Sequence, residues 1–206
     1  RLLVHYCASL TESEKHAQIE SVVEEYQKGD ADFHQMVADM AGISRKQAKT
    51  VNLGIMYGMG RAKLAATLDI TVEEAKNLLE TYHEKVPFVK GLADRVSTKA
   101  QKDGRIRTIL GRKCRFDMWE PRSFEYNKPM KLKEAQAEYG PQRIRRAFTY
   151  KALNKLIQGS AADQTKKAMA DCYAEGLVPL MTVHDELCFS VESEQQASKI
   201  TEIMET

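Results

Sequence analysis

The residues most suggestive of chemistry form a line of side chains spaced four apart: Arg45, Lys49, Leu53 and Tyr57. In an α-helix each step of four drifts about 40° around the axis, so the four side chains fall on one broad face. That face presents two cations, a leucine and a phenol, an array suited to a triphosphate with its nucleoside at the apolar end. His34 would add another phosphate donor. Cations near a helix start oppose its macrodipole, which favours a binding role, although an amphipathic helix gives the same spacing.

A second cluster is Val183-His184-Asp185-Glu186-Leu187, in which two adjacent acids stand between apolar runs. We expect a two-stranded hairpin with the polar residues at its tip. Carboxylates presented in this way suit Mg²⁺, which takes few protein ligands together with phosphate oxygens. In isolation the three polar residues are explained more simply by an ordinary hairpin turn. A metal hydrolase of the His-Asp type would need further paired histidines, which the sequence lacks.

The spacing of apolar residues and the turn signals predict a mostly helical chain with a few short strands. Ser44 is a candidate N-cap for the helix that carries the line of four side chains, and Thr71 with Glu74 forms a capping box. Residues 117–141 are polar, contain three prolines and are expected to form a long loop or an insertion. Helices are expected at 1–28 (ended by Gly29-Asp30), 31–41, 44–57, 61–68, 71–85, 87–102 and 141–175, and strands at 105–110, 177–183 and 187–191.

The composition of the 206 residues, 43% hydrophobic and 29% charged, is that of a globular chain. No run approaches the ~18 apolar residues that span a bilayer, so we expect no membrane contact and a place in the cytoplasm, or in the host-cell cytoplasm if the source is viral. The four scattered cysteines indicate reduced thiols. Residues 90–155 hold 18 Lys and Arg against 7 Asp and Glu, which indicates either a surface for a polyanion or a solvated face.

Taken in order, five blocks resemble the family A DNA polymerases, the class of bacterial DNA polymerase I and many phage replicases. The resemblance covers essentially the whole chain, and five blocks in the right order leave little room for chance. The blocks are Asp32-Phe33-His34, the fingers-helix residues of motif B (Arg45, Lys49, Asn52, Gly54, Tyr57 and Gly58), the strand block 104–112, the helix block 154–163, and His184-Asp185-Glu186 of motif C.

The resemblance implies template-directed DNA synthesis, in which the primer 3′ hydroxyl attacks the α-phosphate of a dNTP and pyrophosphate leaves. Arg45 and Lys49 would bind the incoming triphosphate with help from His34. Lys49 would also act in catalysis by offsetting charge on the departing phosphates. Leu53 would lie against the sugar, and Tyr57 would stack near the template base. The implied partners are dNTPs and primer–template DNA.

For the DNA and the metal ions the resemblance implies a further set of residues. Contacts to the minor groove read acceptors that all base pairs share, so they check shape without choosing sequence. Asp185 would ligate two Mg²⁺ ions that stabilise the attacking and leaving oxygens, and Glu186 would support that site. The implied DNA-binding residues are Asn154, Gln158, His184 and Arg112.

One departure from the family pattern concerns motif A, which reads Asp-x-Ser-Gln-x-Glu-x-Arg followed by an apolar stretch and a His. Residues 1–6 resemble only the tail of that block. A metal-binding aspartate and the steric-gate glutamate would therefore lie before residue 1. We predict that the chain alone is inactive or nearly so, unless a separate polypeptide supplies motif A together with a thumb and an exonuclease.

Three further departures limit what the resemblance transfers. Leu53 stands where the family usually has Phe or Tyr, which predicts altered discrimination at the sugar 3′ position unless leucine is only a packing substitution. The insertion-like stretch 117–141 would contact DNA through its lysines or lie free on the surface. Tyr150 stands where bacterial members often carry an arginine, so that contact does not transfer.

Two other classes stay open. Single-subunit RNA polymerases share the spacing of Arg45, Lys49 and Tyr57, but in that family the motif C aspartate is typically followed by Ser, where this chain has Glu186. A catalytically incomplete, DNA-binding half of a split or decayed polymerase fits the missing motif A.

The expected fold class is α+β, with a mostly helical fingers subdomain and part of a palm that contains an antiparallel β-hairpin. We expect residues 1–30 to connect palm and fingers, residues 31–145 to form the fingers with 117–141 as an insertion-like loop, and residues 146–206 to form the palm portion.

Overall fold

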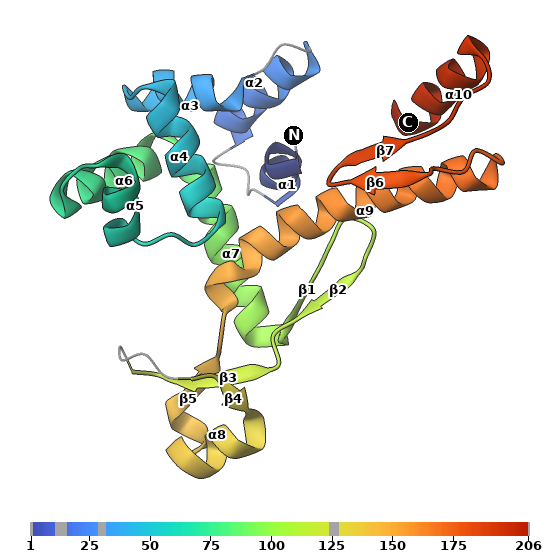
Figure 1. Ribbon diagram of the computed structural model, residues 1–206. Helices are drawn as coiled ribbons and strands as arrows, with labels where there is room; N and C mark the ends of the chain where they lie inside the picture. Colours follow the sequence, from blue (N-terminus) through green and yellow to red (C-terminus); the bar gives the residue numbers. More distant parts are fainter. Residues whose placement is uncertain (1, 11–15, 29–31, 124–127, 206) are drawn as a thin grey trace.

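The computed structural model describes residues 2–10, 16–28, 32–123 and 128–205. Helices predominate, and the described strands form three small antiparallel sheets (Figure 1). The expected α+β class is confirmed. None of the described helices is both long enough and apolar enough to span a membrane.

The N-terminal segment forms two helices where one was expected over 1–28. Leu3 and Val4 are buried in the first, and Ile19 and Val22 in the second, so each helix packs its own apolar stripe. Residues 11–15 contain no apolar side chain, so nothing in that stretch continues either stripe. The expected break at Gly29-Asp30 lies outside the described residues. The two helices are α1 (Leu2–Leu10) and α2 (His16–Gln27).

The next five helices follow the predicted order closely because their ends carry strong local signals. The Ser44 hydroxyl accepts a hydrogen bond from the Gln47 N–H, and Thr71 is paired in the same way with Glu74, so both predicted N-caps are confirmed. Pro87 occupies the first turn of its helix, where its missing N–H costs nothing. The helices are α3 (Phe33–Ala41), α4 (Arg45–Met56), α5 (Arg61–Leu68), α6 (Val72–Lys85) and α7 (Pro87–Asp103).

One hydrophobic core joins these helices to α1, α2 and the long helix α9 (Ala152–Ala174). Tyr82 and Phe88 are among the largest side chains that are fully buried in it. The core also fixes which side of α4 faces inward, because Ala48 and Val51 are completely buried there. The line of residues four apart therefore faces outward.

A hairpin of two short strands, β1 (Arg105–Arg107) and β2 (Lys113–Arg115), follows α7 directly. The strands pair antiparallel, with Ile106 opposite Cys114. The strand expected over 105–110 ends earlier because the chain turns at Gly111, whose φ is 83° and whose N–H donates to the Thr108 carbonyl.

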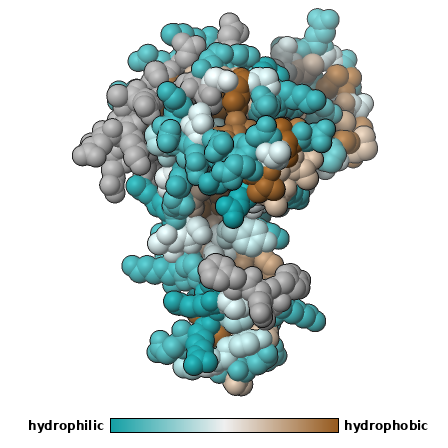
Figure 2. Space-filling model, turned by 90° about the vertical axis from the view of Figure 1, so that its left-hand side faces the viewer, coloured by the Kyte–Doolittle hydropathy of each residue, from teal (hydrophilic) through white to brown (hydrophobic). Residues whose placement is uncertain are grey.

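Of the two expectations for residues 117–141, a long loop or an insertion, the long loop is wrong. The described part of this stretch folds with residues 142–146 into a small lobe (residues 118–123 and 128–146), which projects away from the helical body in Figures 1 and 2 and is mostly hydrophilic on the face shown. Its strands are only two to four residues long and pair with residues distant in the sequence, so they are too short to show a periodic pattern of apolar residues. The lobe contains β3 (Met118–Pro121), β4 (Met130–Lys131), α8 (Leu132–Tyr139), η2 (Pro141–Arg143) and β5 (Ile144–Arg146), with sheet order β4-β3-β5.

Arg146 connects the small lobe to the helical body through hydrogen bonds and a cation–π contact. Its Nε donates to the Gln101 carbonyl at 3.2 Å and its Nη1 to the Phe116 carbonyl at 2.9 Å. The guanidinium also lies 4.6 Å from the centre of the Trp119 ring. Gly104 leaves room for this group, because a Cβ there would come within 2.6 Å of the Arg146 Cζ. Where the lobe begins and ends, the Ala147 N–H donates to the Met118 carbonyl at 2.9 Å.

The C-terminal part carries α9 and the second hairpin. The helix expected over 141–175 begins only at Ala152, because the residues before it form η2, β5 and η3 (Thr149–Lys151). It ends just before Gly176, whose φ is 77°. The last helix packs on α9 through a small second core of Cys172, Leu177 and Ile200. The remaining elements are β6 (Met181–Val183), β7 (Glu186–Cys188) and α10 (Glu194–Glu205).

Candidate nucleotide and nucleic-acid site

The outward face of α4 presents the four predicted side chains in line. Arg45, Lys49, Leu53 and Tyr57 are all exposed, the last two to 39% and 52%. Asn52, the residue before Leu53, is buried on the inward side of the helix with Ala48 and Val51. The helical spacing predicted from the sequence is therefore confirmed, and the face offers two cations followed by an apolar and an aromatic surface.

Asp32 joins this face to α3. One of its carboxylate oxygens caps α3 by accepting hydrogen bonds from the N–H groups of His34 and Gln35. The other oxygen accepts from Arg45 Nε at 2.7 Å. This hydrogen bond from Arg45 is the main reason why the pKa of Asp32 is lowered. Because the contact uses only Nε, the guanidinium has two further nitrogens to offer to a second anion.

His34 lies close enough to Arg45 and Lys49, the other two predicted phosphate donors, for their charges to act on its ring. Burial lowers the pKa of His34, and the charges of Arg45 and Lys49 lower it further, while Asp32 opposes them. The structure therefore brings together His34, Arg45 and Lys49, which the sequence analysis assigned to one ligand. Asp32 was not among the predicted site residues, although its position two residues before His34 was visible as part of the same block.

The far end of the α4 face reaches α9. The Tyr57 hydroxyl accepts a hydrogen bond from Gln158 Nε2 at 3.3 Å. Gly58 follows with a φ of 67°, and a Cβ there would lie 2.8 Å from a ring carbon of Tyr150. This close approach lets the chain turn away from α4 beside the segment that precedes α9. Tyr57 and Gln158, predicted to contact template and duplex, are therefore neighbours.

Asn154 lies one turn before Gln158 on α9, so the two amides share a helix face. The side chain is half-buried, and its Nδ2 is buried without a hydrogen-bond partner in the part of the chain that the structure describes. An unpaired buried donor is costly, and Nδ2 has almost no surface that a partner outside the chain could reach as the side chain stands. The predicted contact of Asn154 with DNA stays a prediction.

Arg112 is engaged inside the structure. Its Nε donates to Asp163 Oδ1 at 2.8 Å and its Nη2 to the Gly159 carbonyl at 2.7 Å. Asp163 Oδ2 accepts from the Leu110 N–H, so the turn of the first hairpin is held on α9. Gly159 permits this approach, since a Cβ there would meet the Thr108 methyl at 2.7 Å. The contacts give Arg112 a structural role, and its predicted contact with DNA stays a prediction.

Replacing Asp163 by asparagine is expected to destabilise the chain at neutral pH by about 1–3 kcal/mol, the cost of weakening bonds to a buried group. Burial alone would raise the pKa of Asp163, but the hydrogen bonds from Thr108, Arg112 and the Leu110 N–H outweigh it, and the pKa is lowered. The carboxylate therefore contributes stability above the unfolded pKa of about 4, and this contribution is lost as pH falls through the lower folded pKa. Urea unfolding at pH 7 and pH 3 should show a smaller destabilisation at pH 3.

The second hairpin differs slightly from its prediction. His184 and Asp185 form the two-residue turn, with a φ of 54° at His184, while Glu186 is already in β7 opposite Val183. Both acids are exposed. Within the described ranges no group of three or more His, Cys, Asp or Glu side chains gathers as a metal site would require. The carboxylates suit Mg²⁺ in their chemistry, but they supply only part of a site.

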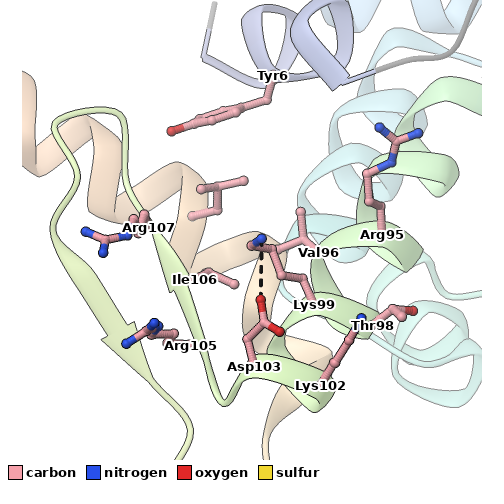
Figure 3. Close-up of a pocket in the computed structure, with 11 residues that line it drawn as sticks. Tyr6, Arg95, Val96, Thr98, Lys99, Lys102, Asp103, Arg105, Ile106 and Arg107 are labelled. Carbon is pink, nitrogen blue, oxygen red and sulfur yellow. Dashed lines mark ion pairs between the residues drawn. The ribbon is translucent and has the colours of Figure 1, made fainter.

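A basic pocket of about 640 Å³ lies between α1, α7, β1 and α9 (Figure 3). Tyr6 overhangs it, and its hydroxyl lies 2.8 Å from the Ser160 hydroxyl. Asp103 forms an ion pair with Lys99 at 3.4 Å. Part of the positive charge of residues 90–155 therefore lines this pocket, which is separate from the α4 face. Its cationic lining residues are Arg95, Lys99, Lys102, Arg105 and Arg107.

Comparison with known proteins identifies the family. The family model for DNA polymerase family A matches residues 15–206, so the chain belongs to that family, as the five sequence blocks indicated. The DNA-directed DNA polymerase of Pseudomonas phage M6 is 34% identical over 244 aligned residues, which cover 100% of this chain and 33% of the phage protein. DNA polymerase I of Geobacillus stearothermophilus is 34% identical over 182 residues, covering 84% of this chain and 19% of that protein.

A solved structure shares the fold. The POL domain of Pol1 from M. smegmatis, in complex with DNA primer-template and dNTP, matches with a TM-score of 0.69 and 28% identity. The match covers 99% of this chain and 34% of that chain. This chain therefore spans about a third of the phage relative and of the solved chain, and a smaller share of the bacterial polymerase.

Proposed function

We propose that this chain is the fingers and part of the palm of a DNA-directed DNA polymerase that extends a primer by dNMP units. The observation that carries the proposal is the exposed line on α4, which begins beside His34 and ends at the contact between Tyr57 and Gln158. Two cations followed by an apolar and an aromatic surface suit a nucleoside triphosphate lying along the helix, and the helix ends beside α9, to which we assign duplex binding. In this division residues 1–30 connect palm and fingers, 31–145 are the fingers and 146–206 are the palm portion.

Each side chain of the line has a distinct task in this proposal. Arg45 and Lys49 bind the phosphates, and Lys49 offsets the charge that builds on the departing pyrophosphate. Leu53 offers the sugar an apolar but non-planar surface. Tyr57 stacks near the template base, and Gln158 reads the minor groove beside it. Because these contacts hold the phosphates and the sugar in place, they orient the α-phosphate for the primer 3′ hydroxyl.

The same proposal assigns the second hairpin to metal binding. Asp185 and Glu186 would hold Mg²⁺, which neutralises charge on the phosphates and on the attacking oxygen. Asp163, an acid on α9, is committed to Arg112 and the Leu110 N–H. We therefore propose that carboxylates outside this chain complete the two-metal site and that the chain alone does not catalyse extension.

Primer extension tests the proposal directly. The chain would be grafted in place of the matching third of the Pseudomonas phage M6 polymerase, and the chimera, the parent enzyme and the bare chain would be compared on a primed template with Mg²⁺. We expect templated extension from the chimera and the parent and none from the bare chain.

Other outcomes would change the assignment. A folded chimera that binds primer–template but adds no nucleotide would replace catalysis by the second candidate, a DNA-binding fragment. Extension by the bare chain would show that the metal site is complete within these residues. Preference for rNTPs over dNTPs would favour an RNA polymerase.

A further inference from the structure

Two hydrogen bonds, one buried and one partly buried, link three helices beneath the α4 face. The Tyr82 hydroxyl on α6 donates to Asn52 Oδ1 on α4 at 2.6 Å. Asn52 Nδ2 lies 3.0 Å from His34 Nδ1 on α3. Tyr82 and Asn52 are 0% and 2% exposed, so neither polar group can turn to water instead. The two hydrogen bonds therefore fix the orientation of the His34 ring through its Nδ1.

The direction of these bonds decides where the imidazole carries its hydrogen. An amide nitrogen can only donate, so Nδ1 of His34 must accept with its lone pair. A neutral imidazole has one N–H, which then lies on Nε2. A doubly protonated ring would turn a second donor toward the Asn52 amide nitrogen, so Asn52 also disfavours the charged form.

We propose that Asn52 and Tyr82 are positioning residues that hold His34 in the neutral tautomer with its hydrogen on Nε2, so that the ring donates this N–H to a phosphate oxygen of the bound triphosphate. The identity of the ligand rests on the proposed function, whereas the tautomer rests only on the two hydrogen bonds. Asn52, on the inner face of α4, thus sets the tautomer of His34, which lies beside the outer face of the same helix.

The charges around His34 agree with a neutral ring. Burial lowers the pKa of His34, and Arg45 and Lys49 on α4 lower it further. Asp32 at the start of α3 acts in the opposite direction, and Tyr82 on α6 has its own pKa raised by burial, so it stays neutral. A neutral donor holds its hydrogen across the neutral and mildly alkaline range. The opposite tautomer would present a lone pair to the phosphate, which repels it.

Histidine nitrogen NMR on the whole chain tests the tautomer without any nucleotide. The sequence has five histidines, so spectra of chain labelled with ¹⁵N-histidine are assignable by single substitutions. At pH 7.5 (about one unit above the ordinary histidine pKa) we expect His34 to show a bare Nδ1 and a protonated Nε2. A protonated Nδ1 would mean that the Asn52 amide faces the other way, which would overturn the proposal.

Variants separate positioning from packing. Asn52→Asp replaces the donor by an acceptor, so His34 should move its hydrogen to Nδ1 and its pKa should rise. Tyr82→Phe keeps the ring and removes only the hydroxyl, which frees the amide and should give a mixture of tautomers. His5 is the internal control, because its exposed side chain lies on α1 and not on the three helices that carry the substituted residues, so its signals should not change. If Asn52→Asp fails to fold, the unmodified chain and Tyr82→Phe still test whether the two hydrogen bonds set the tautomer. An unchanged spectrum of Tyr82→Phe would contradict a role for Tyr82 in holding His34.

Titration with inorganic triphosphate then tests the role in binding. His34→Ala should weaken binding on the order of tenfold, the effect of one hydrogen bond to a charged group. Tyr82→Phe should weaken binding when His34 is present and add nothing in the His34→Ala background. Additive effects would show that Tyr82 acts only on the fold. If His34 shows the expected tautomer but the chain binds no triphosphate, the assignment of a triphosphate ligand is wrong, and the proposed function with it. The role of Asn52 and Tyr82 in setting the tautomer of His34 would still stand.

Discussion

Replacing Asp185 by alanine in the M6 chimera is expected to lower the rate of nucleotide addition on the order of a thousandfold, the scale of losing one preorganised electrostatic contact at a reacting centre. Asp185 stands in a two-residue turn, where its exposed carboxylate is free to meet a metal ion and phosphate oxygens. Single-turnover extension of a labelled primer measures the rate. Binding of primer–template should change little, because the DNA contacts proposed for α9 are untouched.

A matched variant guards against a general effect of removing an acid. Asp171 is a carboxylate on α9 that is paired with Lys167, so Asp171→Ala should leave the rate within about twofold. Glu186→Gln should have an effect between the two, because Glu186 lies in the strand beside the turn. An Asp185→Ala chimera that keeps its rate within about tenfold would move the metal-binding role to another carboxylate.

Gly104→Ala is expected to destabilise the chain by about 3 kcal/mol. Part of this cost is conformational, since Gly104 has a φ of 67°. The larger part comes from Arg146, whose guanidinium would have to leave a Cβ that is 2.6 Å away. That movement breaks hydrogen bonds to the carbonyls of Gln101 and Phe116 and separates the cation from Trp119.

Gly111→Ala separates the two contributions. Gly111 also has a positive φ, 83°, but no atom lies within 4 Å of where its Cβ would be. Its alanine variant should therefore lose only the conformational part, about 1 kcal/mol. Urea unfolding of both variants gives the comparison. Equal losses would show that Arg146 does not stabilise the junction with the small lobe.

Elements whose ends carry local signals were predictable from the sequence. Helix α5 has the predicted bounds, and α4 and α6 begin directly after the caps Ser44 and Thr71. The small lobe was not predictable, because its strands pair residues such as Trp119 and Arg146 that are far apart in the chain. The late start of α9 has the same cause, since β5 pairs with β3 and removes residues 144–146 from the expected helix.

The candidate site divides in the same way. The exposed line on α4 follows from spacing alone, because a helix fixes which residues share a face. Asp32, Asn52 and Tyr82 could not be given roles from spacing, since their contacts to Arg45 and His34 cross between helices. The motif C hairpin was predictable as a turn, but whether Asp185 or Glu186 occupies it depends on strand register, which a short apolar run does not specify.

The two ends of the small lobe meet, since the backbone at Met118 and Ala147 is joined by a hydrogen bond. A segment that leaves and returns at one point replaces a short connection without moving its neighbours, and the entropy of closing a longer loop grows only slowly with its length. The junction at Met118 and Ala147 is therefore a point at which a segment of different length can be inserted. A lobe attached in this way can be lengthened, replaced or removed while the helical body keeps its shape.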